Sequence, residues 1–328
     1  MTSEKHTQPI TIIAAELLAK LRAVEVLVEA AGGDQTAYRQ VATAIDDCLA
    51  RLSELNVWGE ENRLPSSEIW NAAGHLLERG WLQNRARTKP RGYAGDHELL
   101  SRIFERKFCE DRLGRLFDRY FQDQLAPQAV RNRMQMAKEW IEAAVCAGQS
   151  AVRIAIVGSA LGLEVREALV QLNEEARKRV SLTLIDLDPA AVDLARDRLS
   201  SLLPEGQLSA ISTNIFRLPQ RRESEALAGT DLLICPGLFD YLDDGAAVNM
   251  LRCFYEKLDD GGRMVVFQFA PHNPTRGYME WFANWYLKYR DVAELRRIVE
   301  MARLAGAEVR FGAEVLGIDL FVEVRRSV

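Results

Sequence analysis

The spacing of apolar residues along the chain changes near residue 150. Before that point apolar residues recur every three to four positions, which is the period of an amphipathic helix. This pattern predicts helices over 10–31, ended by Gly32-Gly33, over 36–57, from Pro65 to about 79, after Asp96, and over about 111–123 and 127–147. Residues 1–148 are therefore predicted to form an all-helical domain.

Beyond residue 150, short β-rich runs alternate with helical patterns. Strands are predicted over 152–157, 181–186, 208–212, 231–235, 263–269, 307–312 and 317–325, and helices over 161–177, 189–203, 222–228, 244–258 and a long region 277–305. The order strand–helix–strand implies parallel strands with right-handed crossovers, whereas the last two strands follow each other as a hairpin. We predict a doubly wound, Rossmann-like α/β sheet with an antiparallel C-terminal hairpin over residues 149–328, preceded by the helical cap 1–148.

The segment 152–188 contains the first candidate residues for ligand binding. Gly158 and Gly162 follow its first strand, and Asp186 ends its second. Ligands of parallel sheets bind outside the carboxyl ends of the strands, where a glycine turn lets the backbone approach them and an acid accepts hydrogen bonds from ribose hydroxyls. A nucleoside-bearing cofactor is the first hypothesis. The alternative is a glycine turn that binds nothing.

Composition narrows the class of function. The chain is 48% hydrophobic and 27% charged, which is typical of soluble globular proteins, and its net charge of −5 disfavours nucleic-acid binding. The five cysteines show no metal-ligand spacing, which is typical of reduced thiols. The most apolar stretch, Ile10–Ala31, contains five charged residues, and the N-terminus lacks a signal-peptide pattern. We expect a cytoplasmic protein with no metal, no nucleic-acid partner and no integral membrane segment.

Two stretches of the helical half stand out. The helix 36–57 has an apolar seam that favours helical core or a homodimer contact over a cofactor site, and it consists of Tyr38, Val41, Ile45, Cys48, Leu52 and Leu55. The stretch Gln83–Glu98 is polar and basic, and we expect a long ordered loop of the kind that is often functional. Asp96 has an alternative role there as the N-cap of the next helix.

The order of elements over about 150–328 resembles the class I S-adenosylmethionine-dependent methyltransferases. The resemblance implies that the turn Gly158, Ser159, Ala160 and Gly162 cradles the methionine part of the cofactor, that Asp186, followed by Leu187, binds the ribose, that Asn214 contacts the adenine amino group between Ile215 and Phe216, and that Pro236 and Gly237 in CPGLFDYL lie at the reactive end.

Two positions depart from the family's pattern, since Ile156 replaces a usual acid and Ala160 a usual glycine. Glu164 can supply the missing carboxylate for the cofactor's ammonium group. Its alternative is an ordinary glutamate in the first turn of a helix, favoured by the helix dipole.

A narrower resemblance rests on KPRGYAGD (Lys89–Asp96), GLFDYLDD (Gly237–Asp244) and the run Asn273–Asp291. These blocks resemble a bacterial methyltransferase group associated with biosynthesis of the extracellular factor 3-hydroxypalmitic acid methyl ester. The resemblance implies a helical cap over the substrate side, with KPRGYAGD at the pocket.

Methyl transfer from a sulfonium needs alignment of donor and acceptor and exclusion of water. A carboxylate acceptor is ionised at neutral pH and needs no base, whereas a hydroxyl acceptor needs one. The candidates are Arg91 and Arg276 as carboxylate-binding groups, Tyr93, Tyr241, Tyr278 and Tyr286 as orienting groups, His97 or His272 as general base, and Trp281, Trp285 and Tyr289 as one aromatic helix face that is either core or an acyl-chain lining.

The leading hypothesis is a methyltransferase (EC 2.1.1) that converts S-adenosyl-L-methionine to S-adenosyl-L-homocysteine and forms a methyl ester on a small molecule. The alternatives are an O- or N-methyltransferase of a natural-product intermediate that uses a general base, a nicotinamide-dependent oxidoreductase, and a non-catalytic cofactor-binding regulator. DNA adenine methylation is disfavoured because CPGLF follows the fourth strand in place of the Asn/Asp-Pro-Pro-aromatic motif that grips a flipped base.

Overall fold

The computed structural model describes residues 3–30 and 34–327 of the 328-residue chain, so the predicted helix end at Gly32-Gly33 lies outside the described residues. The chain divides into two compact units. The first consists of Met1–Gln128 and Asn273–Leu287, and the second of Ala129–His272 and Lys288–Val328. This division differs from the predicted boundary at 148/149 in two places, because most of helix α7 goes with the sheet and the segment 273–287 goes with the N-terminal helices.

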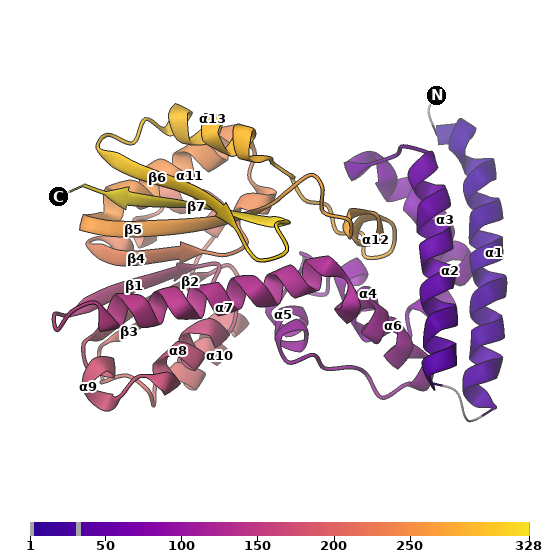
Figure 1. The fold of residues 1–328 in the computed structure, drawn as a ribbon, viewed down its shortest axis with the longest axis horizontal. Helices are drawn as coiled ribbons and strands as arrows, with labels where there is room; N and C mark the ends of the chain where they lie inside the picture. The colour runs from indigo at the N-terminus through magenta and orange to yellow at the C-terminus, as the bar shows by residue number, and fades with distance from the viewer. Residues whose placement is uncertain (1–2, 31–33, 328) are drawn as a thin grey trace. The chain divides into compact units, whose positions relative to one another are not determined.

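The first unit is helical, as predicted. Its elements are α1 (Ser3–Glu29), α2 (Asp34–Glu54), the 3-10 turn η1 (Gly59–Asn62), α3 (Arg63–Leu77), α4 (Trp81–Thr88), α5 (His97–Phe104), α6 (Arg112–Asp123) and α12 (Arg276–Trp281) (Figure 1). Val41, Ile45 and Leu52 of the apolar seam on α2 are fully buried, and α2 packs against α1 and α6. The seam is therefore internal core of this unit.

The prediction of a long loop over 83–98 is wrong for its first residues, which are helical. Helix α4 continues to Thr88, because Gln83–Thr88 contains helix-forming side chains such as Arg85 and Ala86 and no glycine or proline. The helix ends at Lys89, which has a left-handed φ of 49° and precedes Pro90. Asp96 caps α5, accepting hydrogen bonds from the backbone N–H groups of Glu98 and Leu99.

The second unit contains one seven-stranded sheet in the order β3-β2-β1-β4-β5-β7-β6 (Figure 1). The strands are β1 (Val152–Val157), β2 (Val180–Asp186), β3 (Leu208–Ser212), β4 (Thr230–Cys235), β5 (Leu258–Phe269), β6 (Ala307–Ala313) and β7 (Asp319–Arg326). The first five strands are parallel, and the last two form the predicted antiparallel hairpin, with β7 against β5.

Helices cover both faces of this sheet (Figure 1). One apolar core lies under α7 (Leu125–Cys146), α8 (Leu163–Gln171) and α10 (Pro189–Leu199), and the other lies under α11 (Asp244–Lys257) and α13 (Val292–Ala302). The shorter elements are α9 (Glu174–Arg177), η2 (Ile215–Gln220), η3 (Arg222–Leu227) and η4 (Phe239–Tyr241). The predicted α/β doubly wound fold is confirmed.

Two predicted helices are interrupted. The helix 161–177 breaks at Leu172, and Asn173 caps the short α9. The region 277–305 contains α12 and α13, separated by residues 282–291, because Asp291 forms a capping box with Glu294 and starts a new helix. The predicted aromatic helix face is therefore wrong: Trp281 ends α12, and Trp285 and Tyr289 lie in the irregular segment.

Candidate functional site

The glycine turn after β1 lies at the carboxyl edge of the sheet, as predicted. The backbone N–H groups of Gly158 and Ser159 both donate to Ile185 O, at 2.8 and 3.3 Å. Gly158 has a φ of +77°, and a Cβ built on it would meet nothing within 4 Å. Glycine is required there by the backbone conformation, and the space above the turn is open to a ligand.

Asp186 holds this turn in place. Its Oδ2 accepts a hydrogen bond of 2.7 Å from the backbone N–H of Ala160, and its Oδ1 accepts one of 3.0 Å from Asp188. The side chain is buried, and burial raises the pKa of Asp186, while the two backbone N–H groups offset part of that rise. Each carboxylate oxygen retains a lone pair, which is what a ribose hydroxyl needs.

Ala160 has a left-handed φ of 44°. A residue with a Cβ is strained in this conformation by roughly 1–2 kcal/mol. The hydrogen bond that the Ala160 N–H donates to Asp186 helps to hold this conformation. The hydroxyl of the neighbouring Ser159 is buried with no hydrogen-bond partner in the described part of the chain.

Glu164 occupies the first turn of α8, directly after the glycine turn. Its side chain is only 7% exposed, and burial raises the pKa of Glu164 to about 7. Its own backbone N–H and the charges of Arg133 and Arg198 act in the opposite direction. A buried carboxyl group at this end of the sheet is a natural partner for an incoming cation.

The sequence reasoning missed Arg133 on α7. Its Nη1 donates to Asp319 Oδ2 at 2.8 Å, and its Nη2 lies 3.8 Å from the point where a Cβ on Gly237 would stand. Arg133 is 8% exposed and Asp319 fully buried. A signal was available, because Arg133 interrupts a stripe of buried apolar residues four apart that includes Ala129, Ala137, Ile141 and Val145.

Two further carboxyl groups belong to this part of the sheet. Asp240 Oδ1 accepts hydrogen bonds from Gln268 Nε2 and from the backbone N–H of Phe269, at 2.9 and 2.8 Å. Asp319 Oδ1 is buried without a hydrogen-bond partner among the described residues. Burial raises the pKa of Asp240 and of Asp319, and the charge of Arg133 opposes both shifts.

The remaining predicted cofactor residues lie after β2, β3 and β4. Asn214 caps η2, with its side-chain oxygen accepting from the backbone N–H of Phe216 at 3.1 Å. Phe216 is 41% exposed. Ile215 belongs to the apolar core, and Leu187 packs against that core. Pro236 and Gly237 are half-buried directly after β4. Every predicted cofactor residue belongs to the second unit.

The predicted catalytic residues are divided between the units, with Arg91, Tyr93, His97 and Arg276 in the first and Tyr241 and His272 in the second. The Nε of Arg276 donates to the fully buried Glu280 at 2.7 Å, and its guanidinium stacks on Trp58. Arg91 is exposed and lies 3.3 Å from Glu98 Oε1.

The two candidate histidines differ in exposure. The His97 side chain is only 2% exposed, in the first turn of α5. His272 is exposed, and its Nε2 lies 3.0 Å from Gly317 O. Tyr278, predicted as an orienting group, is core, since its hydroxyl donates to Gln83 at 2.6 Å and its ring packs on Tyr120.

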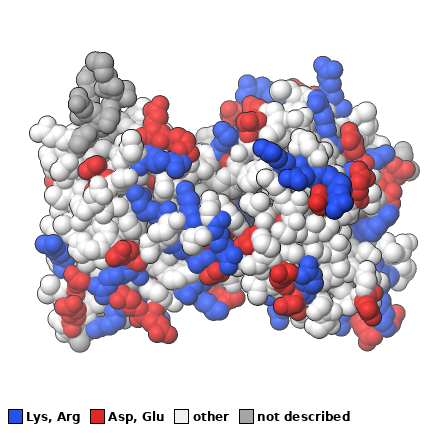
Figure 2. Space-filling model, turned by 180° about the vertical axis from the view of Figure 1, so that it is seen from behind, with Lys and Arg blue, Asp and Glu red and all other residues white. Residues whose placement is uncertain are grey.

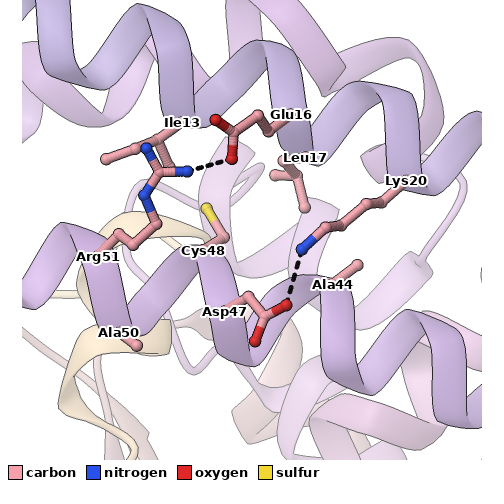
Figure 3. Close-up of a pocket in the computed structure, with 9 residues that line it drawn as sticks. All are labelled: Ile13, Glu16, Leu17, Lys20, Ala44, Asp47, Cys48, Ala50 and Arg51. Carbon is pink, nitrogen blue, oxygen red and sulfur yellow. Dashed lines mark hydrogen bonds and ion pairs between the residues drawn. The ribbon is translucent and has the colours of Figure 1, made fainter.

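A hollow of about 260 Å3 lies between α1 and α2 (Figure 3). Its charged side chains neutralise one another, because Lys20 pairs with Asp47 at 2.7 Å and Arg51 pairs with Glu16. Cys48 lies in this hollow, and burial raises the pKa of its thiol to about 12. This hollow therefore offers no reactive thiolate and no unpaired charge.

The surface carries charges of both signs. Basic and acidic side chains are interspersed on the face that Figure 2 shows. Within residues 3–30 and 34–327, no helix is long and apolar enough to cross a membrane, and no group of three or more His, Cys, Asp or Glu side chains is arranged to hold a metal ion.

No family model matches this sequence, and no curated protein shows significant sequence similarity to it. Solved structures do match. The crystal structure of a possible exported protein from Bordetella parapertussis has a TM-score of 0.56 at 20% identity, over 71% of this chain and 80% of that one. The CurJ carbon methyltransferase has a TM-score of 0.53 at 11% identity, over 99% of this chain and 93% of that one. The chain therefore shares a methyltransferase-type Rossmann fold with CurJ.

Proposed function

We propose that this protein is an S-adenosylmethionine-dependent methyltransferase that forms a methyl ester on a small carboxylic acid. The observation that carries the proposal is the turn at the end of β1, which is tied to Asp186 by Ala160 and has open space above Gly158. This is the arrangement that a nucleoside-bearing cofactor requires of a parallel sheet. The methyltransferase-type fold narrows the cofactor to S-adenosylmethionine.

The residues of the second unit fit the parts of this cofactor. In our proposal Asp186 accepts from the ribose hydroxyls and the exposed Phe216 ring covers one face of the adenine. Glu164 pairs with the ammonium group, which accounts for a buried carboxyl group beside the glycine turn. Arg133, whose Nη2 faces Gly237, is the candidate partner for the cofactor's carboxylate. The bound cofactor supplies the activated methyl group.

A carboxylate acceptor fits the candidate groups better than a hydroxyl. His97 is buried and His272 contacts a backbone carbonyl, so neither is an evident general base. An ionised acceptor needs only alignment and exclusion of water, and alignment can supply roughly 7–11 kcal/mol. We assign Tyr241, which ends η4 shortly after β4, to orienting the acceptor. The narrower sequence resemblance favours a fatty-acid-like acceptor such as a 3-hydroxy acid.

The cofactor assignment is tested by calorimetric titration with S-adenosylmethionine and S-adenosylhomocysteine. Asp186→Ala should weaken binding of both by roughly tenfold or more, because a charge-assisted hydrogen bond contributes about 1.5–3 kcal/mol. Asp197→Ala, an exposed change on α10, is the matched control and should bind normally. Unchanged affinity in Asp186→Ala contradicts the assignment, and stabilisation by NAD instead favours an oxidoreductase.

The product identifies the acceptor group. Transfer of radiolabelled methyl to carboxylic acids should give a product that mild alkali converts to volatile methanol, because methyl esters hydrolyse and methyl ethers or amines do not. An alkali-stable product supports the O- or N-methyltransferase alternative with a general base. Cofactor binding without turnover on any acceptor supports the regulator alternative.

A further inference from the structure

A second cluster of charged and aromatic side chains lies entirely within the first unit, at the end of α4. The Arg87 guanidinium lies 4.7 Å from the centre of the Trp70 ring. Among the described residues its hydrogen bonds are two long ones of 3.4 Å, to the backbone carbonyls of Ser66 and Trp281. No carboxylate among the described residues lies within ion-pair distance of it. Burial lowers the pKa of Arg87 to about 10, so this cation lacks a compensating charge.

Lys89 adds a second such cation. Its backbone has a left-handed φ of 49°, and its Nζ lies 5.9 Å from the centre of the Tyr286 ring. Burial and the neighbouring charges of Arg63 and Arg87 lower the pKa of Lys89. It also forms no ion pair within the described part of the chain. The left-handed conformation is that of a residue that ends a helix, here α4.

The acids Glu60 on η1 and Glu280 on α12 are engaged elsewhere. Glu60 pairs with Arg63 at 2.6 Å. Glu280 accepts from Arg276 at 2.7 Å and from the backbone N–H of Gly59 at 2.6 Å. Each of these acids therefore has its own cation, and Arg87 and Lys89 leave an excess positive charge between half-buried aromatic rings.

Buried polar atoms without partners in the described part of the chain lie on α3 and α12, which supply the two carbonyls that Arg87 contacts, and on the segments next to them. Both polar side-chain atoms of Asn62, which is 0% exposed, lack a hydrogen-bond partner, as do Trp70 Nε1, Trp281 Nε1 and Asn284 Oδ1. These residues belong to η1, α3, α12 and the segment after α12, and η1, α3 and α12 contact one another. A buried polar group without a partner costs about 1–3 kcal/mol, so a concentration of them indicates a place where a ligand completes the bonding.

We propose that Arg87 and Lys89 form a binding site for a small organic anion, with its carboxylate between the two cations and its apolar part on the rings of Trp70 and Tyr286. A desolvated guanidinium favours a carboxylate because it offers two parallel N–H donors in a fixed plane. The aromatic faces already hold both cations and extend the site with apolar surface. The inference concerns the first unit alone and goes beyond the proposed methyl transfer.

The test is ligand binding to the full chain without S-adenosylmethionine. The probes are 4-phenylbutyrate, its neutral isostere 4-phenylbutyramide, and inorganic phosphate, measured by saturation-transfer NMR and calorimetry. We expect saturable binding of the carboxylate, with the amide and phosphate each at least about tenfold weaker, because the amide lacks the charge and phosphate lacks the apolar part.

Variants assign the site to its residues. Arg87→Met keeps the stem on Trp70 and should weaken 4-phenylbutyrate binding by roughly tenfold or more, with Arg87→Lys intermediate. Lys89→Met should also weaken 4-phenylbutyrate binding, and this variant provides the test if Arg87→Met does not fold. Arg39→Met, an exposed change on α2, is the control. The proposal is overturned if 4-phenylbutyrate does not bind saturably, if the amide binds equally well, or if phosphate binds more tightly. It is also overturned if both folded variants keep full affinity. Because no cofactor is present, such a failure leaves the methyltransferase proposal untouched.

Discussion

Glu164→Gln offers the sharpest test of the site, because it separates the stability of the fold from binding of the cofactor. Glu164 is buried, and its pKa is raised from 4.5 to about 7. The folded state therefore holds a proton that the unfolded state has released at any pH between these values. For an acid whose pKa is raised by folding, stability is lost as the pH rises from the unfolded pKa through the folded one.

The magnitude follows from the size of the shift. One pKa unit corresponds to about 1.4 kcal/mol, so a rise from 4.5 to about 7 costs about 3 kcal/mol above pH 7. Glutamine has nearly the shape of the neutral acid and no charge to desolvate. The stability of Glu164→Gln relative to the natural protein should therefore increase by about 2–3 kcal/mol between pH 5 and pH 8.

The same change should weaken cofactor binding. If Glu164 pairs with the ammonium group of S-adenosylmethionine, the natural protein binds the cofactor more tightly as the pH rises from 6 to 8, because the acid must lose its proton. Glu164→Gln should bind roughly tenfold more weakly at pH 8 and lose this pH dependence.

The assays are calorimetric unfolding without cofactor at pH 5 and pH 8, and titration with S-adenosylmethionine over the same range. Glu175→Gln, an exposed change on α9, is the control and should alter neither measurement. A stability difference that does not change with pH refutes the raised pKa. A variant that binds the cofactor normally refutes the pairing with the ammonium group, even where the stability result holds.

Two further predictions concern the same end of the sheet. Ala160→Gly should stabilise the fold by about 1 kcal/mol in urea unfolding without weakening cofactor binding, because glycine adopts the observed φ of 44° without strain; a less stable variant would show that Ala160 is not strained. Arg133→Met should destabilise the second unit by about 3–5 kcal/mol, because it leaves Asp319 buried and unpaired, and the double change Arg133→Met with Asp319→Leu should recover most of that loss. If the double variant is no more stable than the single one, the pair does not act as a unit.

Local sequence determined those elements whose side chains pack only against the core next to them. The strands 152–157 and 208–212 were predicted to the residue. In the first, the β-branched residues Val152, Ile154 and Ile156 alternate along the strand. In the second, the apolar residues Leu208, Ala210 and Ile211 are interspersed with serines. The same reasoning located the turn from Gly158 to Gly162 and the acid at Asp186, because residues that end parallel strands meet at one edge.

The division into units depended on contacts that no local pattern contains. The segment 273–287 leaves the sheet and packs with the N-terminal helices, where Thr275 accepts from the backbone N–H of Ala126 and Tyr278 donates to Gln83. A helical period over 277–305 could not reveal this, because hydrogen bonds to residues about 150 and 195 positions away hold α12 against the N-terminal helices.

For the charged groups, too, the sequence determined some features and the tertiary structure determined others. The sequence alone determined that a glycine turn and Asp186 would meet, because the order of strands brings them together. Only the tertiary structure decided that Glu164 is buried, that Arg276 is committed to Glu280, and that Arg87 has no acid beside it. The physical reason is that the pKa and the availability of a charged side chain depend on its burial and on its nearest charges, and both are set by residues distant in the chain.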